Sequence, residues 1–188
     1  MDYSNKAWCD TQSLVSIVET LKGDLDGIEI GVLRGGSSID LLTNIPRIRK
    51  LVCIDPFLPY IGISFEKYQS AEFWEDMYKS VLDEFDKFDG RAELIRDKSE
   101  NVASKLEDGK YDFIFIDGDH SYEGVKKDIT LYEPKLKKGG LLIGHDYNKS
   151  HKDRVMKAVD EYVEKENRDL HLVQEGNGGP NLIYYWKV

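Results

Sequence analysis

The chain has 188 residues and a net charge of −9 at neutral pH, from 26 Lys and Arg against 35 Asp and Glu. With 40% hydrophobic and 11% aromatic residues it has the composition of a globular protein, long enough to bury a core. The negative balance argues against a protein that coats nucleic acid, which needs a basic face, and against a polybasic protein of the membrane surface.

Short apolar runs alternate with longer amphipathic stretches along the chain, which is typical of successive βαβ units. In the first half we expect helix 11–21, strand 27–32, helix 36–42, strand 50–55, an irregular loop 56–71 and helix 72–88. In the second half we expect strand 91–97, helix 99–106, strand 111–118, a helix within 121–136, strand 139–146 and helix 153–165. Residues 169–188 are expected to form two antiparallel strands joined by a glycine-rich turn.

Right-handed crossovers between these units predict an α/β protein with a Rossmann-like, doubly wound, mostly parallel seven-stranded sheet and a C-terminal antiparallel hairpin. The two cysteines, Cys9 and Cys53, provide no disulfide framework. No apolar run is long enough to span a bilayer, and the first residues lack the features of a signal peptide. We therefore expect a cytoplasmic protein without a membrane partner.

Polar residues or glycines follow all five predicted parallel strands. They are Glu29 and Gly31, Asp55, Asp97, Asp117 with His120, and His145 with Asp146. A single Asp after a strand is usually a helix cap or a turn former. Because open α/β sheets bind ligands outside the carboxyl ends of their strands, five such positions together favour a ligand site.

The loop EIGVLRGGSS, residues 29–38, joins a strand to a helix and contains three glycines, Gly31, Gly35 and Gly36. Glycine permits positive φ and a close approach of the backbone to a ligand. The spacing matches neither the dinucleotide pattern G-x-G-x-x-G nor a phosphate-binding loop. Asp55 follows this loop at the position from which an acid accepts hydrogen bonds from a ribose diol.

The motifs EIGVLRGGSS, CIDPF, FIFIDGDHSYEGVKKDI and LKKGGLLIGHDY resemble those of class I S-adenosylmethionine-dependent methyltransferases. The branch they resemble most is that of the macrolide-sugar and catechol-type O-methyltransferases, over residues 25–188. The resemblance implies a single methyltransferase domain, 1–188, with an N-terminal helical segment in 1–24 and a cofactor-binding core in 25–188. It also implies S-adenosyl-L-methionine as cofactor and a small-molecule hydroxyl, such as that of a sugar or glycosylated metabolite, as methyl acceptor.

The resemblance further implies cofactor-binding roles for individual residues. The methionine part of the cofactor would be lined by Glu29, Gly31, Gly35 and Ser37. Asp55 would hold the ribose, and Asp97 and Ser99 would border the adenine. Asp117 is expected at the cofactor as well.

Catalysis on a hydroxyl requires its deprotonation or its coordination to a metal. By resemblance, His120 matches a general base, and Asp117 and His145 are candidate catalytic residues beside it. Asp117, Asp146 and His145 occupy positions at which metal-dependent relatives carry ligands. Carboxylates suit Mg²⁺, whereas His145 stands where the catechol-type pattern has an acid, and imidazole suits zinc or a later transition metal. Whether a divalent metal is bound stays open at this point.

The loop 56–71 and the hairpin tip 176–181 are expected to face the acceptor, because variable loops carry specificity. Four aromatic residues would form an apolar wall there or, alternatively, cover the sheet edge: Phe57, Tyr60, Phe65 and Tyr68. Three other functions remain open, namely a nicotinamide-dependent oxidoreductase, a non-catalytic α/β assembly module and a hydroxylase-like relative. The glycine spacing disfavours the first. A homo-oligomer is compatible with the sequence.

Overall fold

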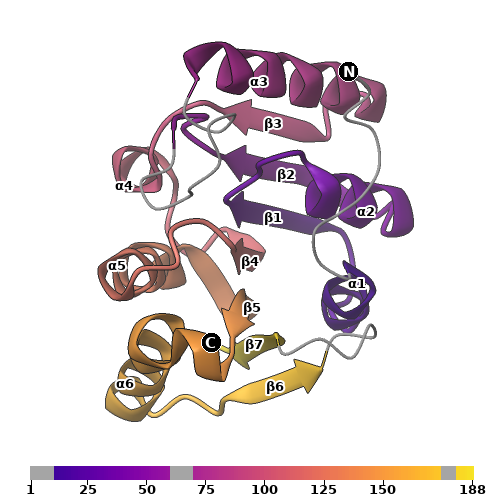
Figure 1. Cartoon of the computed structure of the whole chain (residues 1–188). Helices are drawn as coiled ribbons and strands as arrows, with labels where there is room; N and C mark the ends of the chain where they lie inside the picture. The colour runs from indigo at the N-terminus through magenta and orange to yellow at the C-terminus, as the bar shows by residue number, and fades with distance from the viewer. Residues whose placement is uncertain (1–10, 60–69, 175–180) are drawn as a thin grey trace.

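Figure 1 shows the computed structural model, in which a seven-stranded sheet lies between two layers of helices. The structure describes residues 11–59, 70–174 and 181–188. The strand order is β3-β2-β1-β4-β5-β7-β6. Strands β1 to β5 pair in parallel, whereas β7 is antiparallel to both β5 and β6. The predicted fold class is confirmed, including the C-terminal antiparallel strands.

The strands of the sheet are short apart from β5. They are β1 Leu25–Ile30, β2 Ile48–Ile54, β3 Ala92–Ile95, β4 Tyr111–Ile116, β5 Leu136–Tyr147, β6 His171–Gln174 and β7 Leu182–Lys187. Strand β5 begins at Leu136, before the predicted start at residue 139. Gly139 has a φ of +85° and lies inside a register shift between β5 and β4, so it is an irregular position within the strand and not its first residue.

Six α-helices occur in the described part of the chain. They are α1 Thr11–Glu19, α2 Gly36–Asn44, α3 Ala71–Phe85, α4 Ser99–Val102, α5 Tyr122–Tyr132 and α6 Lys157–Glu166. The predicted helix 99–106 is a single α-turn that continues as the 3₁₀ segment Ala103–Lys105. The start of the predicted helix 153–165 lies in a π-helical segment, Lys152–Met156. None of the described helices has the length and apolar character that crossing a membrane requires.

The central strand β4 shows how both faces of the sheet are covered. Phe113 and Phe115 pack in a core with residues of α1, α2 and α3, whereas Ile114 and Ile116 pack in a second core with residues of α4, α5 and α6. A strand buried on both faces is apolar at every position, which explains the continuous run in the sequence. In Figure 1, α4, α5 and α6 lie on the left of the sheet and α1 and α2 on the right.

The register of the parallel strands aligns their carboxyl ends. Ile95, Ile54, Ile30, Ile116 and Gly144 form one row across the sheet, each paired with its neighbour on the next strand. Most of the polar residues and glycines predicted at the strand ends come one or two positions after this row. Glu29 comes one position before it and His120 four positions after it. The fold therefore gathers them at a single edge of the sheet, which is where ligands of doubly wound sheets bind.

Candidate active site

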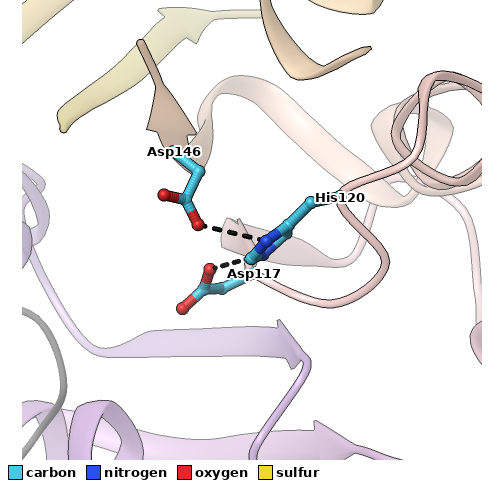
Figure 2. Close-up of side chains that lie close together, drawn as sticks. All are labelled: Asp117, His120 and Asp146. Atoms are coloured by element: carbon cyan, nitrogen blue, oxygen red, sulfur yellow. Dashed lines mark hydrogen bonds and ion pairs between the residues drawn. The ribbon is translucent and has the colours of Figure 1, made fainter. Parts of the chain in front are cut away.

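Three side chains from two neighbouring strand ends converge at this edge, as Figure 2 shows. Nε2 of His120 lies 3.2 Å from Oδ1 of Asp117, and Nδ1 of the same ring lies 3.2 Å from Oδ2 of Asp146. Asp117 directly follows β4, and Asp146 lies near the end of β5. One imidazole is thus held between two carboxyl groups.

Asp146 reaches this position through an unusual backbone conformation. Its φ is +61°, a left-handed value that is uncommon for residues other than glycine but tolerated by Asp. The pairing of β5 with β7 shifts register between Gly144 and Tyr147, around Asp146. Such outliers cluster at functional sites, where the surrounding structure maintains them. Here the irregularity turns the Asp146 carboxyl group toward His120.

His145 lies beside the same group and is buried, with 7% of its side chain exposed. Its Nδ1 is 3.6 Å from Oδ1 of Asp117 and 3.4 Å from Oδ2 of Asp146. The structure therefore brings together all four residues that the sequence analysis assigned to catalysis or metal binding.

The surroundings of His120 stabilise its protonated form. Burial lowers its pKa, but the hydrogen bond to Asp117 and the charges of Asp117 and Asp146 outweigh burial and the opposing effect of His145. The pKa of His120 is therefore raised above its ordinary value. The two carboxyl groups thus favour the imidazolium form of His120 and fix the orientation of its ring.

The same cluster has the donor atoms of a metal site. Three possible ligand atoms lie within 4.8 Å of one another, one from each of Asp117, His120 and Asp146. Two carboxylates and one imidazole suit zinc or another transition metal better than Mg²⁺, which prefers oxygen ligands alone. His145 adds a second imidazole close to both carboxylates. The residues present thus fit a divalent cation in the place that a proton on His120 would otherwise fill.

Glu29 on β1 is completely buried and is bound by the first turn of α2. The hydroxyl groups of Ser37 and Ser38 each donate a hydrogen bond to one oxygen of its carboxyl group. Burial raises the pKa of Glu29 to about 7, against the effect of the two serines, and the charges of Asp117 and Asp55 raise it further. Ser37 is among the residues that the sequence motifs predict at the cofactor, whereas Ser38 is not.

Gly31 permits the close packing of β1 against β4 at this edge. Its φ is +89°, and a Cβ atom there would lie 2.2 Å from the carbonyl oxygen of Asp117. Any larger residue would push the backbone of Asp117 away and so displace the carboxyl group that contacts His120. Gly31, in the loop after β1, is therefore needed for the position of Asp117 in the loop after β4.

The carboxyl group of Asp55, at the end of β2, organises the first loop. Oδ2 accepts hydrogen bonds from the backbone N–H groups of Val32 and Leu33, at 2.9 and 3.0 Å, and Oδ1 accepts one from Phe57, at 2.7 Å. A carboxylate has about four acceptor positions, so one remains among the described residues. This is sufficient for one hydroxyl group of a ligand. Leu33 and Phe57 both have positive φ, of 49° and 48°.

Asp97 and Ser99 follow β3 at the same edge and bind other protein groups. Oδ1 of Asp97 accepts hydrogen bonds from the Lys98 backbone and from the Asn101 side chain, and these bonds lower the pKa of Asp97. The hydroxyl group of Ser99 donates to Oδ1 of Asp128, at 2.6 Å. Asp128 is not among the site residues predicted from the sequence, although its place between Val125 and Ile129 on the apolar stripe of α5 is a usable signal.

Part of the expected acceptor side lies outside the described residues, including Tyr60, Phe65, Tyr68 and most of the hairpin tip. Phe57 is described and is fully buried, with its ring 5.3 Å from that of Tyr78 in an edge-to-face arrangement. Phe57 therefore belongs to the core and covers the sheet, which was the alternative interpretation of the aromatic loop. Asp119 accepts a hydrogen bond from the Ser121 backbone ahead of α5, and Ser121, not Asp119, is the N-cap of this helix.

The strand order and the antiparallel C-terminal strands are those of the α/β Rossmann-like methyltransferase fold. A family model described as a methyltransferase domain matches residues 28–147, more than half of the chain. The chain therefore belongs to this family of S-adenosylmethionine-dependent methyltransferases, as the motifs in its sequence predict.

One relative is an uncharacterized protein of Acanthamoeba polyphaga mimivirus, 31% identical over 143 residues. The match spans 76% of this chain but only 61% of the length of the viral protein. Two solved structures share the fold. The O-methyltransferase TomG from Streptomyces achromogenes, involved in tomaymycin synthesis and solved in complex with SAM, has a TM-score of 0.65 and 15% identity, with 100% of this chain and 82% of TomG covered.

The second structure is an O-methyltransferase from Bacillus cereus in complex with SAH. Its TM-score is 0.66 at 15% identity, with 99% of this chain and 84% of the Bacillus chain covered. At such low identity these likenesses show the fold alone.

The groups at the sheet edge fit S-adenosylmethionine. This cofactor carries a ribose diol, an adenine amino group, an ammonium group and a sulfonium, so it presents hydrogen-bond donors and positive charge. The carboxyl groups of Asp55, Asp97 and Asp117 lie along the sheet edge as acceptors, and that of Glu29 lies buried beneath it, bonded to Ser37 and Ser38. The chemistry of the donor set therefore agrees with the family.

Proposed function

We propose that this chain transfers a methyl group from S-adenosylmethionine to a hydroxyl group of a small molecule, with His120 as the proton acceptor. The observation that carries the proposal is the position of the His120 ring, between Asp117 and Asp146 at the ligand-binding edge of the sheet. The two structurally similar O-methyltransferases support the type of acceptor. A sugar or glycosylated metabolite remains the proposed substrate class.

The proposed cofactor site follows the order of the strands. Its methionine part would lie against Glu29 and the α2 start, with Gly31, Gly35 and Ser37, and its ribose would donate one hydrogen bond to the remaining acceptor position of Asp55. Asp97 and Ser99 would border the adenine, and Asp117 would lie near the reacting atoms. S-adenosylmethionine supplies an electrophilic methyl group when it is bound.

In the proposed reaction, the bond between sulfur and the methyl carbon breaks as a bond from the acceptor oxygen to that carbon forms. The proton of the acceptor hydroxyl passes to one ring nitrogen of His120. The other ring nitrogen keeps its N–H directed at a carboxyl group, which fixes the tautomer and stabilises the imidazolium that forms. An acceptor that inserts between His120 and one of the two carboxyl groups would remove a contact that stabilises the imidazolium. The ring would then release its proton to solvent, and the neutral ring would take up the proton of the acceptor hydroxyl.

A second candidate is a metal-assisted form of the same transfer, favoured by the ligand atoms of Asp117, His120 and Asp146 within 4.8 Å. A divalent cation would bind there, with His145 as a further ligand, and would lower the pKa of a coordinated hydroxyl group. The two mechanisms differ in what occupies the space between the carboxyl groups, a proton on His120 or a cation.

The direct test is a transfer assay with S-adenosylmethionine and a panel of sugars, glycosides and catechols, in which S-adenosylhomocysteine and the methyl ether are both quantified. With an accepted substrate, we expect His120→Gln to lower kcat by about 100-fold or more. His171→Gln is the matched control, because His171 is exposed and stacks on Tyr185, with ring centroids 4.9 Å apart. Unchanged turnover in the His120 variant would refute the assignment of the proton acceptor.

A further inference from the structure

A buried carboxyl group lies on α5, apart from the cluster around His120. Asp128 is only 4% exposed and shares the apolar stripe of the helix with Val125, Ile129 and Tyr132. Acids are almost never buried to this extent unless a partner satisfies them. Its partner is therefore informative about what the residue does.

Helix α5 holds Ser99 at two points. The Ser99 hydroxyl donates to Oδ1 of Asp128, at 2.6 Å, and the Tyr132 hydroxyl donates to the carbonyl oxygen of Ser99, at 2.7 Å. Asp128 and Tyr132 are one helical turn apart, so a single face of α5 fixes both the side chain and the backbone of Ser99. Ser99 directly follows the loop that leads from β3 to α4.

The first turn of α5 is tied in a similar way to the loop that carries His120. Ser121 caps the helix by accepting a hydrogen bond from the backbone N–H of Gly124, at 3.0 Å. Oδ1 of Asp119 accepts one from the Ser121 backbone, at 2.9 Å. Asp119 lies so close to Gly124 that a Cβ atom there would be 2.6 Å from its carboxyl oxygen. One rigid helix thus contacts both the His120 loop and the segment after β3.

We propose that Asp128 is a positioning residue for the cofactor: by binding the hydroxyl group of Ser99, it sets the segment Asp97–Ser99 in the geometry that receives the adenosine part. The inference rests on the proposed placement of the cofactor at this edge and names a residue that the sequence motifs did not assign. Asp128 acts through Ser99 and does not itself touch the cofactor.

The electrostatic setting of Asp128 agrees with a role as hydrogen-bond acceptor. Burial raises its pKa to about 6, against the hydrogen bond from Ser99, while the charges of Asp119 and Glu100 raise the pKa and that of Lys127 lowers it. Since the contact to Ser99 needs an acceptor and not a charge, asparagine should replace Asp128 with little loss, whereas alanine should not.

The experiment is calorimetric titration of the whole chain with S-adenosylhomocysteine. We expect Asp128→Ala to raise the Kd about tenfold, the amount that loss of one well-formed hydrogen bond accounts for, and Asp128→Asn to stay within about threefold of the wild type. Thr130→Ala, on the exposed side of the same helix, is the control and should bind like the wild type. Asp128→Leu keeps the branched side-chain shape and serves as the second variant that removes the acceptor.

A double-mutant cycle separates this role from general weakening of the fold. If Asp128 acts through Ser99, Asp128→Ala should have no further effect on the Kd in a Ser99→Ala background. Equal affinity of the wild type and Asp128→Ala, additive effects in the cycle, or failure of Asp128→Asn to restore binding would each overturn the inference. A wild-type chain that does not bind S-adenosylhomocysteine would instead overturn the proposed function, and the inference with it.

Discussion

Nδ1 of His120 lies 3.2 Å from Oδ2 of Asp146, and this contact joins the loop after β4 to the end of β5. The two residues meet because β4 and β5 pair in parallel, with Ile116 opposite Gly144, and because the backbone of Asp146 turns out of the strand. Two rigid strand ends therefore determine the orientation of the ring. Such support from fixed elements is what a proton acceptor in a displacement reaction needs.

Removal of metal distinguishes the two forms of the proposed reaction. If a proton on His120 occupies the space between the carboxyl groups, turnover with an accepted substrate should survive dialysis against EDTA and should not rise when Mg²⁺, Mn²⁺ or Zn²⁺ is added. This is the result we expect from the proton-acceptor mechanism. Turnover that is lost with EDTA, restored by one cation and absent in Asp146→Asn would establish the metal-assisted mechanism instead. Asp153→Asn, at an exposed position, is the control.

Replacing Asp55 by asparagine should weaken cofactor binding and the fold together. The amide nitrogen of Asn cannot accept hydrogen bonds, so at least one of the three backbone N–H groups now bound by Asp55 would lose its acceptor. We expect the free energy of unfolding to fall by about 1–3 kcal/mol and the Kd for S-adenosylhomocysteine to rise about tenfold. Urea titration and calorimetry measure the two effects, and an unchanged Kd would contradict the proposed ribose contact.

The buried carboxyl group of Glu29 should make the chain less stable as pH rises. The pKa of Glu29 is about 7 in the folded chain, against an ordinary value of 4.5, so the folded state binds more protons between these two pH values. The free energy of unfolding should therefore decrease from about pH 4.5 to about pH 7, by on the order of 3 kcal/mol from this group. Asp128, whose pKa is also raised, contributes with the same sign.

Glu29→Gln should remove most of this decrease, because glutamine does not titrate. Glu164→Gln, at an exposed position of α6, should leave it in place. Urea titrations of the three proteins at a series of pH values provide the comparison. A pH dependence that is the same in Glu29→Gln as in the wild type would show that another group is responsible.

Glu133, directly after α5, connects this helix to α6 and β7. Its carboxyl group accepts hydrogen bonds from Arg168 at two nitrogens, from the Tyr162 hydroxyl and from Nε1 of Trp186. Glu133→Ala would leave these donors without their acceptor, and we expect it to lower the free energy of unfolding by about 3–5 kcal/mol. Thermal and urea unfolding check this, with Glu164→Gln again as control. A loss below about 1 kcal/mol, the usual range of a surface ion pair, would contradict the assigned role.

The sequence predicts which residues gather at one edge of the sheet because parallel strands impose a simple rule. Each buried strand is a recognisable apolar run, and the residue after it must lie at the same end of the sheet. The order of the apolar runs alone therefore assigns Asp55, Asp117 and Asp146 to one edge. The resemblance to methyltransferases then supplied the type of ligand.

Other features depend on contacts between residues far apart in the sequence. The positive φ of Asp146 and the network around Glu133 have no local pattern that separates them from a turn or a surface acid. The position of Phe57 is equally hard to predict, because an aromatic residue in this loop suits both a wall of the substrate site and a place in the core. Tertiary packing decides between such alternatives, and local patterns do not contain it.

Titration of the wild-type chain with S-adenosylhomocysteine, with NADH as the competing ligand, tests the central claim most directly. We predict one binding site for S-adenosylhomocysteine, about tenfold weaker in Asp55→Asn and unchanged within about threefold in His120→Gln, and no binding of NADH. Tight binding of NADH with none of the thioether, or equal affinity of the wild type and Asp55→Asn, would contradict the assignment of this sheet edge as the cofactor site.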